Sequence, residues 1–268
     1  MLQKVHRKGI DKWGKIWYNI YVDKEEKSPL IEERKMNMNK RMYLIIDVET
    51  ANSTDDALTY DFGMAVVDRY GTVYYKKSVI VRDIFMGEKE LMKSAYYAEK
   101  IPEYWEAIWS KRSQVMSFYE LRRLVLSVMR RYNVYAVAAY NAHFDVTASN
   151  TTQRWLTKSK YRYFFPYGTK VYCIWNMACQ TICSKRNYQK FCIANGMVSE
   201  KGNISTSAES VYAYLHSNPD FEEEHKGLDD VLIEAEIFAK CMRSHKKLDK
   251  GINRACWRMA QKKTELAT

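Results

Sequence analysis

The sequence lacks the segments that would send it across or into a membrane. No apolar run near the N-terminus resembles the core of a secretory signal. The longest uncharged apolar stretch near the middle, Val134 to Tyr140, is too short to cross a bilayer. Internal repeats and low-complexity tracts are also absent. These absences argue against a membrane-spanning protein and a repeat protein, and we expect no membrane partner.

The six cysteines contain no C-x-x-C pair. Cys179 and Cys183 are four residues apart and could face one way on a helix, but the uneven spacing of the other sulfurs disfavours a zinc site. We therefore expect buried free thiols in a reduced, cytoplasmic setting.

Acidic residues are outnumbered: 43 lysines and arginines stand against 32 aspartates and glutamates, for a net charge of +11. An anionic partner such as nucleic acid or a membrane surface is therefore favoured over a cationic one. Residues 1–42 carry a net charge of +5 and residues 240–268 a net charge of +7, so the stretch between them is nearly neutral. We expect the two charged ends to supply the attraction to an anion.

The length of 268 residues, with 47% apolar side chains, suits one substantial domain with extensions or two small domains. We predict a basic N-terminal extension over residues 1–42, a main domain over residues 43–243 and a basic C-terminal tail over residues 244–268. The aromatic positions of the first segment fit both a helix and a strand, so its structure is left open.

Short apolar runs predict the strands of an α/β core. The run Tyr43 to Val48 ends in polar residues and suits a strand buried on both faces. A short turn joins two strand-like runs, Phe62 to Asp68 and Thr72 to Val81, into an antiparallel hairpin. Further strands are predicted at Val134 to Ala139 and Lys170 to Ile174. The sheet is therefore expected to be mixed.

Helices are predicted between and after these strands. Ser117 suits an N-cap for one helix, and others are expected from about Phe144 and through Met177. The spacing of Thr206 and Glu209 is that of a capping box before the next helix. The final helix is predicted to bury a stripe at helical period, namely Leu228, Leu232, Ala235, Ala239 and Met242.

Two carboxylates at alternate positions of the first predicted strand are the first candidate site residues. Asp47 and Glu49 share one side of that strand, because strand side chains have period two. Like charges side by side repel, whereas a hard divalent cation such as Mg²⁺ or Mn²⁺ removes the repulsion. A D-x-E pair at a strand end is common, so the pair alone is a weak signal.

Two more segments carry polar residues at the ends of predicted elements. Asp145 follows the strand Val134 to Ala139, at the carboxyl end where α/β proteins build sites, although an Asp near a helix start is also a common cap. His225 stands before the last helix, and Asp230 lies about a turn inside it. An inner helical Asp gains little from capping, which favours a ligand role for Asp230.

In order and spacing these segments resemble the DEDDh family of 3′-to-5′ exonucleases, the DnaQ-like group that includes the polymerase epsilon proofreading subunit, ribonuclease T and oligoribonuclease. The resemblance spans about residues 43 to 242. Asp47 and Glu49 match the first motif, D-x-E, and Asp145 matches the Asp of the second motif. His225 and Asp230 match the third motif, H-x-A-x-x-D. Gly227 stands where the third motif has alanine, and Tyr60-Asp61-Phe62-Gly63 matches supporting context.

The resemblance implies an α/β fold with a ribonuclease H-like mixed sheet and helices on both faces. It implies an enzyme that removes nucleoside 5′-monophosphates from the 3′ end of DNA or RNA with two Mg²⁺ or Mn²⁺ ions. Asp47, Glu49, Asp145 and Asp230 would hold the ions, and His225 would take the proton from the attacking water. A polymerase or another replication protein is an implied partner.

The resemblance also implies a contact with the terminal nucleotide at Thr50, Ala51 and Asn52, where an apolar wedge is usual in relatives but not obvious here. A stacking ring could come from Phe144 or from Tyr96, Tyr97 and Tyr104, although aromatic residues in such runs are more often core. The glutamates at 222–224 are expected to form a solvated loop whose charge raises the pKa of the His225 imidazole.

Two other functions are compatible with this sequence. The first is a catalytically silent nucleic-acid-binding or polymerase-associated module, against which all five filled motif positions argue. The second is a phosphodiesterase that acts on small nucleotides.

Overall fold

The computed structural model describes residues 9–10, 16–17, 40–244 and 247–261. The chain divides into two units, Met1–Lys40 and Arg41–Thr268. In the first unit, β1 (Gly9–Ile10) pairs antiparallel with β2 (Ile16–Trp17). The open question of whether the aromatic residues of this segment lie in a helix or a strand otherwise falls outside the described residues.

The second unit is built on a six-stranded sheet of order β6-β5-β4-β3-β7-β8. The strands are β3 (Met42–Ala51), β4 (Leu58–Val67), β5 (Val73–Val81), β6 (Gln114–Met116), β7 (Val134–Ala139) and β8 (Val171–Cys173). The pairs β3–β4 and β4–β5 are antiparallel, whereas β3–β7, β7–β8 and β5–β6 are parallel. The predicted hairpin is confirmed, and Gly71 in its turn has a φ of 89°, which favours glycine.

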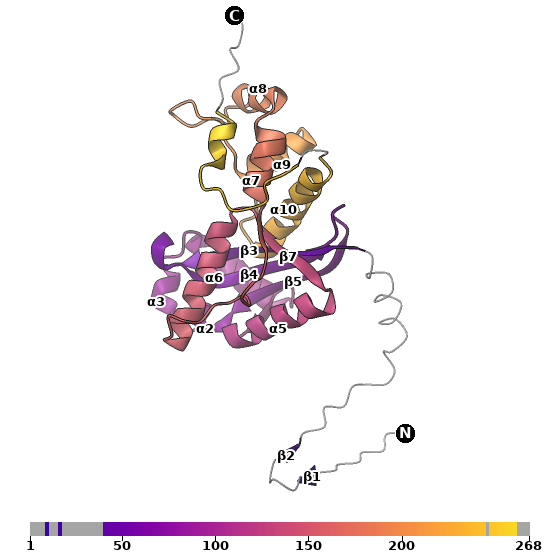
Figure 1. Cartoon of the computed structure of the whole chain (residues 1–268). Helices are drawn as coiled ribbons and strands as arrows, with labels where there is room; N and C mark the ends of the chain where they lie inside the picture. The colour runs from indigo at the N-terminus through magenta and orange to yellow at the C-terminus, as the bar shows by residue number, and fades with distance from the viewer. Residues whose placement is uncertain (1–8, 11–15, 18–39, 245–246, 262–268) are drawn as a thin grey trace, which may run out of the picture. The chain divides into compact units, whose positions relative to one another are not determined.

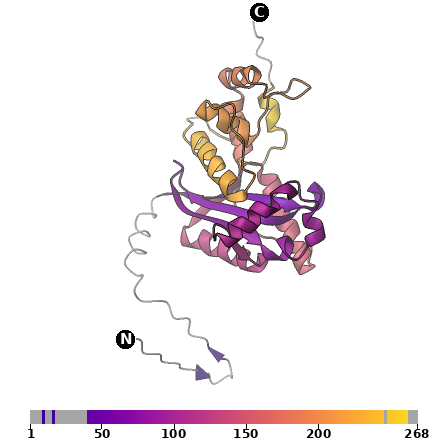
Figure 2. The same ribbon diagram turned by 180° about the vertical axis from the view of Figure 1, so that it is seen from behind.

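Helices cover both faces of this sheet (Figures 1 and 2). The helices whose side chains join the first core cluster are α2 (Arg82–Phe85), α3 (Lys89–Met92), α4 (Ile101–Trp109), α5 (Phe118–Arg131) and α6 (Ala142–Thr157). Those of the second cluster are α7 (Ile174–Ala178), α8 (Arg186–Ala194), α9 (Ala208–His216) and α10 (Gly227–Met242). The predicted α/β fold with a ribonuclease H-like mixed sheet flanked by helices is therefore confirmed.

The central strand β3 is buried on both faces, as its apolar run predicts. Its even-numbered residues, such as Leu44 and Ile46, belong to the first core cluster. Tyr43 and Ile45 belong to the second cluster, on the face that α10 covers. By the same alternation the side chains of Asp47 and Glu49 share the α10 face of the strand.

Two of the predicted helix starts differ in outcome. Ser117 caps α5, as predicted, and it also forms a complete capping box with Glu120. The cap of α9 is one residue later than predicted, because Ser207 accepts the backbone N–H of Ser210. The Thr206 hydroxyl instead accepts a hydrogen bond from the indole N–H of Trp175 at 2.9 Å, so it is not available as a cap.

The predicted stripe of the last helix is offset. Leu228, Leu232 and Met242 are only half-buried, whereas Ile237 and Phe238 are fully buried in the second cluster. The buried face of α10 also carries acidic side chains, which an apolar pattern does not detect.

Residues 247–261, which charge assigns to a C-terminal tail, pack onto the second core cluster. Cys256 and Ala260 are buried there, and the Ala260 carbonyl accepts a hydrogen bond from the Gln189 amide. All six cysteines are buried free thiols, as predicted. Within the described part of the chain, no helix has both the length and the apolar character that a membrane span needs.

Candidate active site and metal site

The three predicted motifs meet at one edge of the sheet. Asp47 and Glu49 lie on β3, Asp145 lies in the first turn of α6 after β7, and Asp230 lies in the first turn of α10. Ligand atoms of Glu49, His225 and Asp230 lie within 4.8 Å of one another. Asp47 interacts electrostatically with Glu49, Asp145 and Asp230. All five candidate residues are therefore brought together by elements far apart in the chain.

Burial raises the pKa of every carboxyl group in this cluster, and neighbouring acids add to the effect at Asp47, Glu49 and Asp230. Burial and then the charges of Asp61, Asp230 and Asp145 raise the pKa of Glu49 to about 9. Burial raises the pKa of Asp145 to about 7, although backbone hydrogen bonds oppose the shift. Burial, and then the charges of Asp229 and Asp61, raise the pKa of Asp230 to about 7.

The cluster fits a divalent cation. Asp230 is almost fully buried, and its Oδ1 atom has no hydrogen-bond partner. Buried polar atoms normally have a partner, so this atom is available to a ligand. No lysine or arginine of the described ranges forms an ion pair with Asp47, Glu49, Asp145 or Asp230. Lys100 acts on Glu49 and Asp230 only as a more distant charge that lowers their pKa. A set of oxygen donors that form no ion pair suits a hard cation such as Mg²⁺ or Mn²⁺.

The metal-free protein is expected to lose stability as the pH rises from about 4 to about 9. The unfolded carboxyl groups ionise near pH 4, whereas Asp145 and Asp230 keep their protons to about pH 7 and Glu49 to about pH 9. The native state thus binds more protons in this range, so each group can remove up to about 1.4 kcal/mol per pH unit.

Thermal unfolding across this range, in a chelator and in Mg²⁺, measures the effect. The melting temperature in chelator should fall with rising pH, and the increase produced by Mg²⁺ should be largest at the alkaline end. A metal-free melting temperature that is flat or rises across the range would contradict the assignment of repulsion to this cluster.

The start of α10 is fixed against β4 by a contact between two glycines. The backbone N–H of Gly227 donates to the Asp61 carboxylate at 3.0 Å, and Asp61 is almost fully buried. A Cβ added at Gly227 would lie 2.7 Å from the backbone nitrogen of Gly63, and one added at Gly63 would overlap the Gly227 carbonyl. Glycine in place of the usual alanine in the third motif thus permits this close approach, which positions Asp230 beside β3.

Gly63→Ala is expected to destabilise the fold by about 1–3 kcal/mol, because a backbone group cannot move aside as a side chain can. Displacement of α10 should also weaken divalent-cation binding. Gly251→Ala is the matched control, since its added Cβ would meet only the Asp249 side chain, at 3.2 Å. Denaturant unfolding and Mn²⁺ titration of both variants measure the difference, and equal stability of the two would count against the glycine contact.

His225 is held by its neighbours in an uncommon conformation. Its φ is 48°, and its ring stacks on Tyr97 with centroids 4.3 Å apart and planes 13° apart. Burial and the charge of Lys100 lower the pKa of His225 below its usual value, against the smaller opposing charges of Glu224 and Glu99.

The charge of Glu224 in the glutamate loop raises the His225 pKa, as expected, but burial and Lys100 outweigh it, so the net shift is downward. Glu222 and Glu224 are exposed to water, and the Glu224 backbone carbonyl accepts a hydrogen bond from Lys100 at 2.6 Å. This contact brings a positive charge toward the imidazole. Glu223 is half-buried, and burial together with the charge of Asp230 raises its pKa to about 8.

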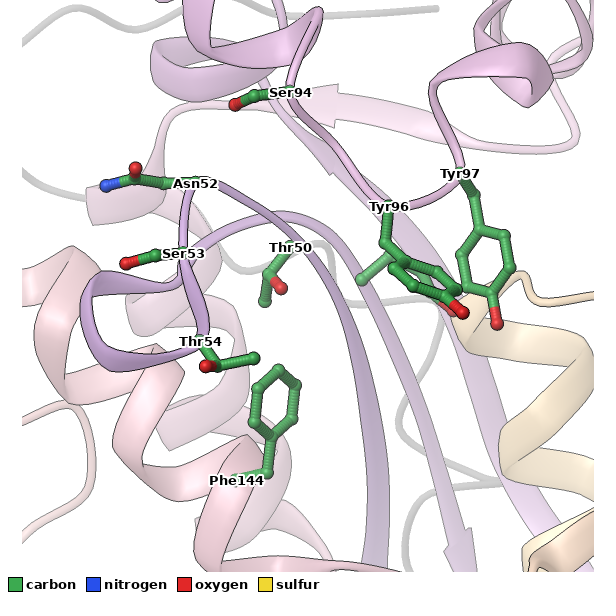
Figure 3. Close-up of a pocket in the computed structure, with 9 residues that line it drawn as sticks. Thr50, Asn52, Ser53, Thr54, Ser94, Tyr96, Tyr97 and Phe144 are labelled. Carbon is green, nitrogen blue, oxygen red and sulfur yellow. The ribbon is translucent and has the colours of Figure 1, made fainter. Parts of the chain in front are cut away.

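A pocket of about 400 Å³ opens beside Glu49. Figure 3 shows the loop after β3, the Phe144 ring from α6 and the rings of Tyr96 and Tyr97 around it. Of the residues expected to contact substrate, Thr50, Asn52 and Phe144 line the pocket. Ala51 is instead fully buried in the first core cluster.

The question of which tyrosines are core is also answered by burial. Tyr96 is 85% exposed and Tyr97 lines the pocket, whereas Tyr104 is buried against Tyr60 and Phe85. A ring on the pocket wall is available for stacking, and a buried one is not.

Glu234 is a carboxylate of this region that motif reasoning does not identify. It is 4% exposed, and its side chain accepts the backbone N–H of Tyr140 at 3.0 Å, just after β7. Burial and the charges of Asp145 and Asp230 raise its pKa. The signal in the sequence is its position four residues after Asp230, on the same helix face.

Comparison with known proteins gives low similarity, to solved structures of exonuclease I. No known family matches the sequence, and no curated protein is similar to it in sequence. Exonuclease I of E. coli in complex with an oligonucleotide is 10% identical, with a TM-score of 0.44 over 74% of this chain and 40% of that chain. A moderately thermophilic exonuclease I from Methylocaldum szegediense is 13% identical, with a TM-score of 0.42 over 75% of this chain and 40% of that chain. This chain thus matches less than half the length of these proteins, and the proposals below rest on its own residues.

Proposed function

We propose that this chain is a metal-dependent 3′-to-5′ exonuclease of the DEDDh kind, which releases nucleoside 5′-monophosphates from DNA or RNA. The observation that carries the proposal is the meeting of Glu49, His225 and Asp230 within 4.8 Å, with Asp47 and Asp145 in electrostatic contact. Three separate motifs contribute to this one cluster.

In this proposal the four carboxylates Asp47, Glu49, Asp145 and Asp230 would hold two divalent ions, Mg²⁺ or Mn²⁺. The chemistry that such ions would supply is activation of water at neutral pH and stabilisation of the leaving oxygen of an in-line phosphoryl displacement. His225 takes the proton from the attacking water, because its lowered pKa leaves the imidazole neutral at physiological pH. Tyr97 keeps the imidazole plane fixed through the stacked contact.

The pocket beside Glu49 receives the 3′-terminal nucleotide. Its volume of about 400 Å³ is within the range of small-ligand sites, and Phe144, Tyr96 and Tyr97 offer aromatic surface to a base. Thr50 and Asn52 offer polar atoms on the same wall. A pocket that admits one terminal nucleotide explains removal from an end rather than internal cleavage.

The silent binding module is disfavoured because buried, unpaired carboxylates reduce the stability of a protein that binds no metal. The small-nucleotide phosphodiesterase is the second candidate, since the same pocket and cluster would serve it. The two enzymes differ in their preference for substrate length.

The test uses 5′-labelled oligonucleotides of DNA and of RNA, in a length series, with Mg²⁺ or Mn²⁺ and with chelator. The proposal expects a ladder that shortens one nucleotide at a time only when metal is present. Cleavage of dinucleotides alone would favour the small-nucleotide enzyme. Oligonucleotides that remain full-length under all conditions would favour the silent module.

A further inference from the structure

One long stretch of this chain carries positive charge alone. Between Asp145 and Glu200 there is no acidic residue, whereas eight lysines and arginines occur there. A net charge summed over the middle of the chain conceals this stretch, because acids elsewhere balance it. Four of the basic residues lie at the end of α6 and in the loop after it, namely Arg154, Lys158, Lys160 and Arg162.

The loop after α6, residues 158–170, also presents aromatic rings to solvent. Tyr161 is 79% exposed, Tyr163 is 56% exposed and Tyr167 is fully exposed. Trp155 on the last turns of α6 is 39% exposed. We call these four rings and the four basic residues the basic aromatic ridge.

The ridge is anchored to the core. Phe164 and Phe165 are buried between the exposed tyrosines, and Phe164 packs against Phe62 and Phe118. The Phe164 backbone N–H donates to the Asn150 side chain at 2.8 Å, and its carbonyl accepts from Arg122 at 2.8 Å. The exposed rings are therefore held out by a fixed backbone and not by an unanchored loop.

Positive charge and aromatic rings alternate along the ridge at close range. The Arg154 guanidinium lies 4.9 Å from the Tyr163 ring centre. The Lys158 ammonium lies 4.6 Å from the Trp155 ring, and the Lys160 ammonium lies 5.2 Å from the Tyr161 ring. Rings interleaved with cations are the surface on which single-stranded nucleic acid binds, since bases stack on rings and cations attract phosphates.

We propose that the basic aromatic ridge binds the part of a single-stranded nucleic acid that lies upstream of the 3′ end held in the active site. The proposal rests on the proposed function and adds a second contact region to it. Trp155 follows Asp145 by ten residues of α6, which is about 15 Å along the helix axis. A strand whose end lies at Asp145 would therefore need on the order of four to six nucleotides to reach the ridge. An acidic protein surface would pair with the cations but would make no use of so many exposed rings.

The test compares three variants of the full chain. In the first, Tyr161, Tyr163 and Tyr167 are all replaced by alanine, and in the second all three are replaced by phenylalanine. Tyr70→Ala is the matched control, because Tyr70 is 59% exposed and lies 5.3 Å from an arginine, but in the β4–β5 turn. Binding of labelled oligothymidylate and oligouridylate of about twenty nucleotides is measured in chelator, and hydrolysis of substrates of about two and about twenty nucleotides is measured in Mg²⁺.

The triple alanine variant is expected to bind the long strand at least about tenfold more weakly and to show a higher KM for it. Its kinetic constants for the short strand should equal those of the wild type. The phenylalanine variant and Tyr70→Ala should bind the long strand with wild-type affinity.

Equal long-strand affinity of wild type and triple alanine variant would overturn the ridge and leave the exonuclease standing. Displacement of the strand by polyglutamate as effectively as by unlabelled strand would show recognition of charge alone and would also overturn it. A wild-type chain that neither binds nor cleaves any strand would overturn the proposed function together with the ridge.

Discussion

Asp47→Asn is expected to abolish hydrolysis while leaving the fold intact. Asp47 is a buried carboxyl of the cluster, and the charges of Glu234, Asp145, Glu49 and Asp230 all raise its pKa. In the proposed function Asp47 is a ligand of ions that stabilise the transition state by several kcal/mol, so loss of its charge should lower the rate by about 10³-fold or more.

The same substitution should raise the melting temperature of the metal-free protein. Each 1 kcal/mol of repulsion that is relieved should raise the melting temperature by roughly 2–4 °C for a domain of this size. Asp55→Asn is the matched control, because Asp55 is exposed in the 3₁₀ helix Thr54–Asp56 near the same pocket. Turnover, Mn²⁺ affinity and melting temperature are measured for both. Wild-type turnover in Asp47→Asn, or equal effects in the two variants, would exclude Asp47 from the metal site.

His225→Ala should lower the single-turnover rate by roughly 10² to 10⁴ and leave Mn²⁺ affinity nearly unchanged, since a general base contributes about that factor. Asp230→Asn should lose both the metal and the activity. The comparison is needed because ligand atoms of His225 and Asp230 are close enough for either to reach one ion.

The pH profile adds a second criterion. A base must be neutral to act, so the wild-type rate should fall as the pH drops through the His225 pKa, which burial lowers below 6.5. This acid limb should be absent from the residual activity of His225→Ala. If His225→Ala loses Mn²⁺ as severely as Asp230→Asn, His225 is a ligand and the proposed division of roles is wrong.

The strands and the motif order could be predicted because they depend on local pattern. The alternation of Tyr43, Leu44 and Ile45 between two cores is visible in the run itself, and the hairpin is marked by its turn. Asp47 and Glu49 share a face for the same reason. These features need no knowledge of distant contacts.

Three of the missed features depend on tertiary contacts. Stacking of Tyr97 on His225 joins residues more than a hundred positions apart, and so does the glycine contact of Gly63 with Gly227. Burial of His225, and then the charge of Lys100 that folding brings to the glutamate loop, lower the His225 pKa against the glutamate charges. The basic aromatic ridge was concealed by averaging charge over too long a segment.

The most direct test of the central claim follows one hydrolytic event in ¹⁸O-labelled water. A single-stranded oligonucleotide with an isotopically marked 3′-terminal nucleotide is incubated with Mg²⁺ and with wild-type chain or Asp47→Asn. The proposed function predicts that the marked nucleotide is released first by the wild type, as a 5′-monophosphate with ¹⁸O in its phosphate, and that chelator or Asp47→Asn stops its release. Release of the 5′-terminal nucleotide first, a 3′-monophosphate product, or equal release in chelator would contradict it.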